Sequence, residues 1–286
     1  MIQYLEHHEI DFERWDACVA SCSSGLPYAF AWYLNTVSEN WSGLVLGDYK
    51  AVMPLPFKKK FGLKYIYQPF FTQQLGVYGT GEVSDFVSSI PNFFLKVHTL
   101  LNYTCKPELS QCIVQINLVL NLKKENLKET FSQNCKRNIR KSDKNNLLVD
   151  STDPDELIQL FRLNKGKTIQ HLKEKNYETL SRLILELNKR NLLECHGIFS
   201  DSKELLGGVI LIKYIKRLIF FFSAMNDKGK ECAAMFRLVN WIIDTYRTDY
   251  DFLDFEGSNN KPLARFYSSF GADEENYYSY KRNVFS

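Results

Sequence analysis

The chain has 286 residues, of which 45% are hydrophobic and 24% are charged, and these are the proportions of an ordinary soluble globular protein. Its formal net charge is only +3, which excludes a strong overall attraction to nucleic acid or to a membrane. This length is comfortable for two domains of about 100–150 residues each.

The cysteines and the short motifs limit the kinds of site and location that we expect. There are seven cysteines, an odd number, and none forms a C-x-x-C pair, so we expect reduced thiols. No secretory leader is recognisable at the N-terminus, so we expect a cytoplasmic location. No apolar run approaches the roughly 20 residues that span a bilayer, so we expect no membrane span. H-E-x-x-H, G-x-G-x-x-G and Walker motifs are missing from the sequence, and we predict no metal site and no DNA partner.

The first half of the chain is predicted to form helices followed mainly by strands. Apolar spacing predicts helices at 11–22, 28–37 and 86–101, strands at 43–46, 50–56 and 112–120, and an extended aromatic segment at 65–71. A basic loop, FKKKFGLK at 57–64, carries four lysines and no acid. The aromatic residues beside it either line a groove for a sugar or a base or simply form core.

A basic segment, ETFSQNCKRNIRKSDKNN at 129–146, is predicted to be a helix that joins the two halves. Its basic residues recur at helical spacing, so several of them share one face: Lys136, Arg137, Arg140, Lys141 and Lys144. Two interpretations stay open, a solvated helix face and a site for phosphates or an acidic substrate. On the second interpretation Arg137 and Arg140 bind substrate.

The second half has a clearer pattern. It predicts helices at 154–164, 177–187, 232–246 and 260–270, and strands at 192–199, 205–213, 217–224, 252–255 and 277–283. The first three strands are joined by short polar turns, so we expect antiparallel neighbours.

The stretch DFLDFEGSNNKPLARFYSSFGA, residues 251–272, reads as strand, polar turn and short helix. Asn260 is a plausible N-cap and Gly271 a plausible C-terminal stop. Glu256 and Asn259 follow the strand at its carboxyl end, where open α/β sheets place ligands.

The same stretch resembles the last motif of the GNAT acyltransferases. Asn260, Tyr267 and Gly271 stand at the spacing of that motif, whereas Leu263 and Ala272 depart from its usual residues. The order of elements in the second half is also the GNAT order. The whole chain resembles the FemAB-type branch, which implies an α/β fold of two tandem GNAT-like domains, each a mixed, mainly antiparallel sheet flanked by helices. We place the domains at 1–128 and 151–286, with a basic connecting helix at 129–150.

The resemblance implies a donor site at the end of the strand 217–224 and in the loop that follows. In GNAT enzymes the strand pairs with the pantetheine arm of acyl-CoA, and the loop holds the pyrophosphate at a helix N-terminus. The implied donor-binding residues are Ser223, Ala224, Met225, Lys228, Gly229, Lys230 and Asn260. Glu231 replaces a glycine of the usual pattern and places a carboxylate near the phosphates, so an ordinary turn is the alternative.

Two residues are candidates for proton transfer. Tyr267 matches the GNAT tyrosine that is often assigned as the acid, and Glu256 could act as base, directly or through water. The alternatives are a core role for Tyr267 and a turn-capping role for Glu256. Asn259 either holds substrate or only contributes to the cap.

The function implied is an N-acyltransferase that moves an acyl group from acyl-CoA, for example acetyl-CoA, to a small-molecule or peptide amine. From the resemblance, the amine belongs to a cell-envelope sugar or peptide precursor. One alternative is aminoacyl transfer from tRNA, which the basic junction favours. The other is a non-catalytic binding module on a GNAT scaffold, which Glu231 favours.

Overall fold

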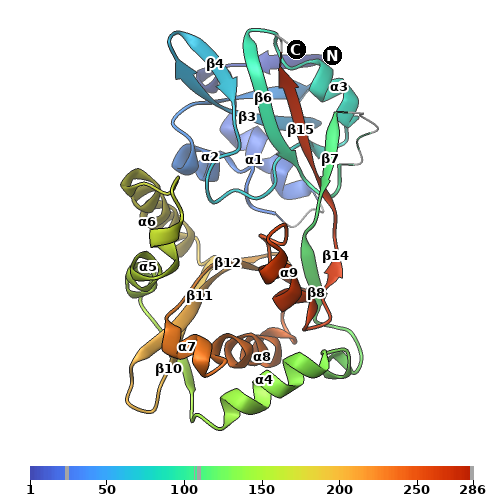
Figure 1. Cartoon of the computed structure of the whole chain (residues 1–286). Helices are drawn as coiled ribbons and strands as arrows, with labels where there is room; N and C mark the ends of the chain where they lie inside the picture. The colour runs from blue at the N-terminus through green and yellow to red at the C-terminus, as the bar shows by residue number, and fades with distance from the viewer. Residues whose placement is uncertain (23–25, 106, 108–110, 284–286) are drawn as a thin grey trace. The chain divides into compact units, whose positions relative to one another are not determined.

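Two β-sheets, one in each of two units, organise the chain in the computed structural model (Figure 1). The structure describes residues 1–22, 26–105, 107 and 111–283. The first unit comprises residues 1–116 with 275–286, and the second unit comprises residues 117–274.

The sheet of the first unit is mostly antiparallel. Its strands, in spatial order, are β1 (Ile2–Leu5), β2 (Trp41–Leu46), β3 (Ala51–Lys60), β4 (Leu63–Ile66), β6 (Phe94–Leu101), β15 (Tyr277–Asn283) and β7 (Cys112–Gln115), and β5 (Tyr78–Gly79) pairs with β3. β4 and β6 are parallel neighbours. The helices of this unit are α1 (Phe12–Ser21), α2 (Ala31–Val37) and α3 (Val83–Ser88).

Helix α1 is fixed to this sheet by one aromatic side chain. Asp11 caps the helix by accepting the backbone N–H groups of Glu13 and Arg14. Trp15, which is fully buried, donates its indole N–H to the carbonyl oxygen of Ala29 at 2.8 Å. Its ring lies where a side chain on Gly43 would project, so glycine is required at that point of β2.

The sheet of the second unit carries helices on both faces (Figure 1). Its strands, in spatial order, are β14 (Asp273–Glu274), β8 (Leu118–Asn121), β13 (Phe252–Asp254), β12 (Arg217–Met225), β11 (Leu205–Tyr214), β10 (Leu193–Phe199) and β9 (Leu148–Ser151). Its helices are α4 (Gln133–Asp143), α5 (Pro154–Leu163), α6 (Glu174–Lys189), α7 (Asp227–Glu231), α8 (Ala234–Tyr246) and α9 (Lys261–Ser268). α8 and α9 share a core with one face, and α4 packs against α8. α5 packs against β11 and β12, and the ring of Phe161 in α5 contacts that of Phe222 in β12.

The predicted strands at 192–199, 205–213 and 217–224 are confirmed as β10, β11 and β12, and they are antiparallel neighbours. The predicted helix at 86–101 is wrong. Pro91 separates the short helix α3 from β6, because proline cannot continue a helix. In β6 the buried residues Val97, Thr99 and Leu101 alternate with more exposed ones, which is the period of a strand.

Three other segments differ from their predictions. The predicted basic loop at 57–64 is the β3–β4 hairpin. The single strand expected at 112–120 is two strands, β7 in the first sheet and β8 in the second. The strand at 277–283 was expected in the second half, but β15 pairs with β6 and β7 of the first unit.

The division into units differs from the domain boundaries expected from the sequence. The chain leaves the first unit after Ile116 and returns to it at Glu275. The helix expected to join the halves, α4, packs inside the second unit.

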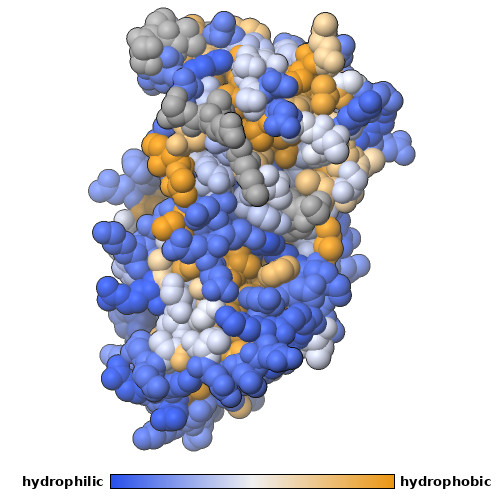
Figure 2. Space-filling model, turned by 90° about the vertical axis from the view of Figure 1, so that its right-hand side faces the viewer, coloured by the Kyte–Doolittle hydropathy of each residue, from blue (hydrophilic) through white to orange (hydrophobic). Residues whose placement is uncertain are grey.

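Hydrophilic residues cover most of the face shown in Figure 2. In the described part of the chain, every helix is too short or too polar to cross a membrane.

Candidate functional site

The candidate site begins where β12 and β13 part. The two strands are parallel and pair over three residue pairs, the last of which joins Ile219 to Asp254. β13 ends at Asp254, whereas β12 continues to Met225. Within the described chain, the edge of β12 beyond Ile219 therefore runs on past the end of β13. A strand edge of this kind offers backbone groups to an extended ligand.

A β-bulge lies at the start of this edge. Leu211 of β11 pairs with Phe220 and Ile210 pairs with Phe222, so Phe221 is the extra residue. A bulge bends its strand and redirects the backbone, and bulges are frequent next to active sites. The bulge therefore bends β12 at the point where it loses β13.

The end of β12 presents the predicted donor residues on two faces. Ser223 lies opposite Val209, and Val209 belongs to the core cluster that contains Tyr267. Met225 packs against the same cluster. Directly opposite residues share a face, so Ser223 and Met225 lie on the Tyr267 side, and Ala224 lies on the other side.

Tyr267 lies at the point where the strands part. Its ring stacks on that of Phe255 with centroids 4.5 Å apart and an interplanar angle of 12°, and it meets the edge of Phe220 at 6.2 Å. These phenylalanines are the residues immediately after the last β12–β13 pair. Burial, and then the negative charge of Glu256, raise the pKa of Tyr267. The phenol keeps its proton at neutral pH, as it would at the ordinary tyrosine pKa of about 10.

Glu256 is held in a backbone conformation that is unusual for a non-glycine residue. Its φ is 48°, and Gly257 follows with a φ of 56°. The backbone N–H of Glu256 donates to Asp254 Oδ1 at 3.1 Å, and its carbonyl oxygen accepts the hydroxyl of Ser258 at 3.0 Å. Such conformations cost about 1–3 kcal/mol and cluster at functional sites. The polar turn after β13 therefore fixes the backbone of Glu256.

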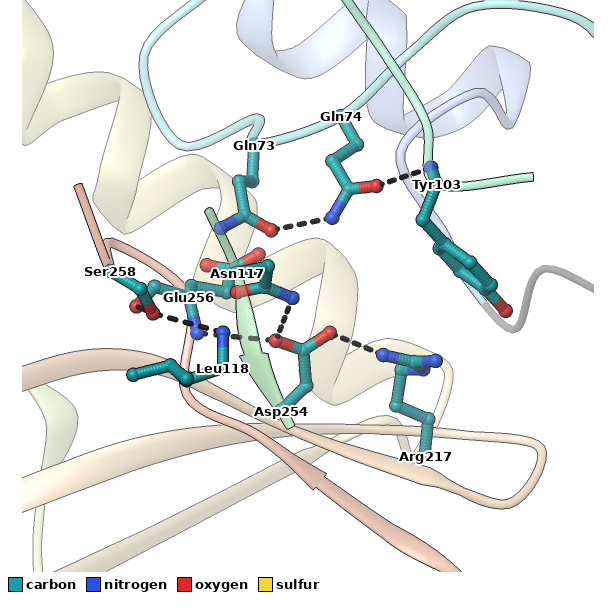
Figure 3. A network of polar contacts seen from close by, with 9 residues as sticks. All are labelled: Gln73, Gln74, Tyr103, Asn117, Leu118, Arg217, Asp254, Glu256 and Ser258. Atoms are coloured by element: carbon teal, nitrogen blue, oxygen red, sulfur yellow. Dashed lines mark hydrogen bonds and ion pairs between the residues drawn. The ribbon is translucent and has the colours of Figure 1, made fainter. Parts of the chain in front are cut away.

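A buried polar network supports this turn, and the sequence reasoning missed it (Figure 3). Asp254 is fully buried; its Oδ2 accepts from Arg217 at 2.6 Å and its Oδ1 accepts from the amide of Asn117 at 2.8 Å. Ser258 Oγ accepts the backbone N–H of Leu118 at 3.0 Å. The available signal was an aspartate between two apolar residues, Leu253 and Phe255, since a charge is rarely buried without a partner.

The loop after β12 is a short helix whose two lysines each form an ion pair. Asn226 caps α7, and its Oδ1 accepts the backbone N–H of Gly229 at 2.8 Å. Lys228 lies 2.7 Å from Glu204, and Lys230 lies 2.8 Å from Asp227. Both lysines are exposed, so these ion pairs are weak and can exchange partners.

The next helix, α8, offers an N-terminus suited to an anion. Ala233 precedes it with a φ of 55° and provides no side-chain cap, and the first turn contains no acid. Ala233 and Ala234 are buried and small. Gly229 is required for packing, because an added Cβ would lie 2.6 Å from the carbonyl oxygen of Leu206. Glu231, at the end of α7, is exposed.

The hydrogen bonds described for the remaining predicted site residues are to residues other than Tyr267. Asn260 is the N-cap of α9, where its Oδ1 accepts the backbone N–H of Leu263 at 3.3 Å, and Asn259 is exposed in the turn before it. Arg137 is exposed on α4 and donates to Asn134 at 2.8 Å, and Arg140 is exposed on the same helix. The structure stacks Tyr267 on Phe255, the residue before Glu256, and it places both arginines on a helix that packs against α8.

Within the described part of the chain, the predicted site residues belong to no metal-binding group and to neither of two cavities. Among the described residues, no group of three or more His, Cys, Asp or Glu side chains could hold a metal ion. Two cavities of about 460 Å³ occur, one in the first unit beside Trp41 and one in the second unit beside Cys195. The predicted site residues line neither of these two cavities. The strand edge and the α8 N-terminus are thus the features that could receive a donor.

No family model matches the chain, and no curated protein matches its sequence. Solved structures match its fold. FemX is 12% identical, with 96% of each chain covered and a TM-score of 0.66. The C-terminal domain of a protein described as a lysylphosphatidylglycerol synthetase, from Agrobacterium fabrum, is 11% identical, with 96% of this chain and 91% of that chain covered and a TM-score of 0.59. A tandem GNAT protein from the clavulanic acid biosynthesis pathway is 8% identical, with 98% of each chain covered and a TM-score of 0.58. The chain therefore has the FemAB-type fold of two tandem GNAT-like domains, as its sequence predicted.

Proposed function

We propose that the chain is an N-acyltransferase that transfers an acyl group from acyl-CoA to an amine. The observation that carries the proposal is the parting of β12 and β13 beside Tyr267. An extended pantetheine arm would pair with the β12 edge, as the resemblance to GNAT enzymes implies. The thioester would then lie near the phenol. One protein of this fold, the tandem GNAT protein, is described as a structure without acetyl-CoA.

The proposed reaction needs one proton donor and one proton acceptor. The amine attacks the thioester carbonyl carbon, a C–N bond forms and the C–S bond breaks. Tyr267 donates its phenolic proton to the leaving thiolate, and Glu256 accepts the proton of the attacking amine, directly or through water. The two residues regain their starting forms when Glu256 returns a proton to the phenolate through solvent.

The pyrophosphate of the donor would bind at the N-terminus of α8, where the helix dipole favours negative charge. Lys228 and Lys230 would exchange Glu204 and Asp227 for phosphate oxygens, which is inexpensive because the existing pairs are exposed. The acceptor amine belongs, on the resemblance, to a cell-envelope sugar or peptide precursor in the cytoplasm.

A second candidate is aminoacyl transfer from charged tRNA. The observation that favours it is the exposed basic surface of α4, which includes Arg137 and Arg140. Glu231 lies in α7 with the two lysines, so the loop is a weaker phosphate site than a glycine-rich one. If neither donor binds, a non-catalytic binding module on the same scaffold is the remaining candidate.

Thermal unfolding of the full chain separates the donors. A ligand at about 100 times its dissociation constant stabilises the folded state by about 2.7 kcal/mol, which gives a measurable shift of the midpoint. We expect acetyl-CoA and CoA to raise the midpoint and tRNA to leave it unchanged. A shift with charged tRNA alone would transfer the proposal to aminoacyl transfer.

The catalytic roles are tested with Tyr267→Phe and Glu256→Gln. Each variant should lower kcat by about 10²–10⁴-fold, the usual contribution of a positioned acid or base. Tyr250→Phe is the matched control, because it removes a phenol elsewhere in the same unit and should leave kcat unchanged. A Tyr267→Phe variant with wild-type kcat would show that this tyrosine is only a core residue.

A further inference from the structure

The β3–β4 hairpin of the first unit ends in an unusual turn (Figure 1). Lys60 pairs with Leu63, so Phe61 and Gly62 form a two-residue turn. Both have positive φ, 51° and 77°, and turns of this class favour Asn-Gly because bulky residues are strained there. The conformation of the turn therefore does not account for a phenylalanine at position 61.

Burial does not explain Phe61 either. Its side chain is 91% exposed, and Leu63 beside it is 45% exposed. Large apolar residues grouped at a projecting point contribute little to folding and commonly mark a surface that meets a partner.

Lysines surround this apolar tip on both faces of the hairpin. Lys59 lies directly opposite Lys64 on one face, and Lys58 and Lys60 lie on the other. Like charges directly opposite each other destabilise a hairpin. Lys64 lies 3.7 Å from Glu6, and the ammonium of Lys60 lies 5.5 Å from the ring centroid of Phe61. The arrangement gains stability from an anionic partner.

We propose that this hairpin tip docks end-on to an anionic lipid bilayer, with Phe61 and Leu63 entering the interface and the lysines binding lipid phosphates. Aromatic and aliphatic side chains combined with cations suit the headgroup boundary. The cations lie on both faces behind an apolar tip, which fits a plane met end-on. A nucleic acid groove would be met by cations along one face. The attraction is local, since the whole chain carries a net charge of only +3.

Co-sedimentation of the full chain with lipid vesicles tests this proposal. The vesicles are phosphatidylcholine alone, or three parts phosphatidylcholine with one part phosphatidylglycerol, each at low and at high salt. We expect binding to the anionic vesicles that weakens with salt, because the Debye length shortens. Phe61→Asn should lower partitioning by about tenfold, from the lost burial of an aromatic side chain. Lys59→Gln and Lys60→Gln should each lower it by about fivefold.

Ile215→Asn is the matched control. Ile215 is 58% exposed at the β11–β12 turn, also with a positive φ of 53°, so asparagine suits both positions. The cations around that turn already have partners: Lys213 binds Glu194, Lys216 donates to the carbonyl of Asp249, and Arg217 binds Asp254. We expect Ile215→Asn to leave vesicle binding unchanged.

Several results would overturn the proposal. They are equal binding to both kinds of vesicle, no binding to either, or equal loss of binding in the two asparagine variants. If Phe61→Asn weakened tRNA binding and left vesicle binding intact, the hairpin would be a nucleic acid surface instead. The assay contains no acyl donor or acceptor, so its result is independent of the proposed acyltransferase activity.

Discussion

Replacing Asp254 with asparagine should destabilise the second unit strongly. Asp254 is fully buried and pairs with Arg217, whose side chain is 5% exposed, at 2.6 Å. Asparagine keeps the size of the side chain and removes its charge. The buried guanidinium of Arg217 then loses the negative charge that lies 2.6 Å from it.

The expected cost follows from this burial. Removing one partner of a buried ion pair costs about 3–5 kcal/mol, because the remaining charge is desolvated without compensation. This is a large share of the roughly 5–15 kcal/mol that stabilises a typical folded protein. Arg217→Met in the same chain removes the second charge. The double variant should therefore lose less free energy of unfolding than the two single variants lose together, by more than about 1 kcal/mol.

Urea unfolding followed by circular dichroism measures these free energies. The control is Lys128→Met, which removes the half-exposed ion pair of Lys128 with Asp244 at 2.7 Å and should cost less than about 1 kcal/mol. Equal losses for Asp254→Asn and Lys128→Met would refute the reasoning. Strict additivity in the double variant would show that Arg217 and Asp254 are not energetically coupled.

Two further predictions concern the same unit. Gly271→Ala should cost about 1 kcal/mol or more of unfolding free energy in urea, because Gly271 has a φ of 79° and an added Cβ would collide with Thr130; an unchanged midpoint would contradict this. Burial lowers the pKa of His196, which bonds Tyr246 at 2.6 Å. The unfolded chain, with a histidine pKa of about 6.5, therefore binds a proton more readily than the folded chain does. The contribution of neutral His196 to folding stability is complete above about pH 6.5, and it is lost as the pH falls towards the lowered pKa. His196→Gln should reduce the fall in thermal midpoint between neutral and acidic pH; equal pH profiles for the variant and the wild-type protein would exclude this linkage.

Local sequence patterns determined much of the second unit. The strands β10, β11 and β12 were recognisable because apolar runs are separated by short polar turns. Asn260 was recognisable as the cap of α9 because capping depends only on nearby residues. The roles of Tyr267, Glu256 and the donor-binding residues stay predictions, although Tyr267 and Glu256 are close enough for the charge of one to shift the pKa of the other.

Long-range pairing was beyond those patterns. β8 lies in the second sheet and β15 in the first, because a strand can pair with any suitable partner strand and the choice depends on residues far away in the sequence. The same holds for Asp254, whose partners Asn117 and Arg217 come from distant segments.

The sequence by itself determined the type and order of most elements, since periodicity and caps act within a few residues. Only the tertiary structure decided which strands pair, where β12 and β13 part, and which charges neutralise one another. Those features depend on contacts between segments that are remote in the chain, and a local pattern carries no information about them.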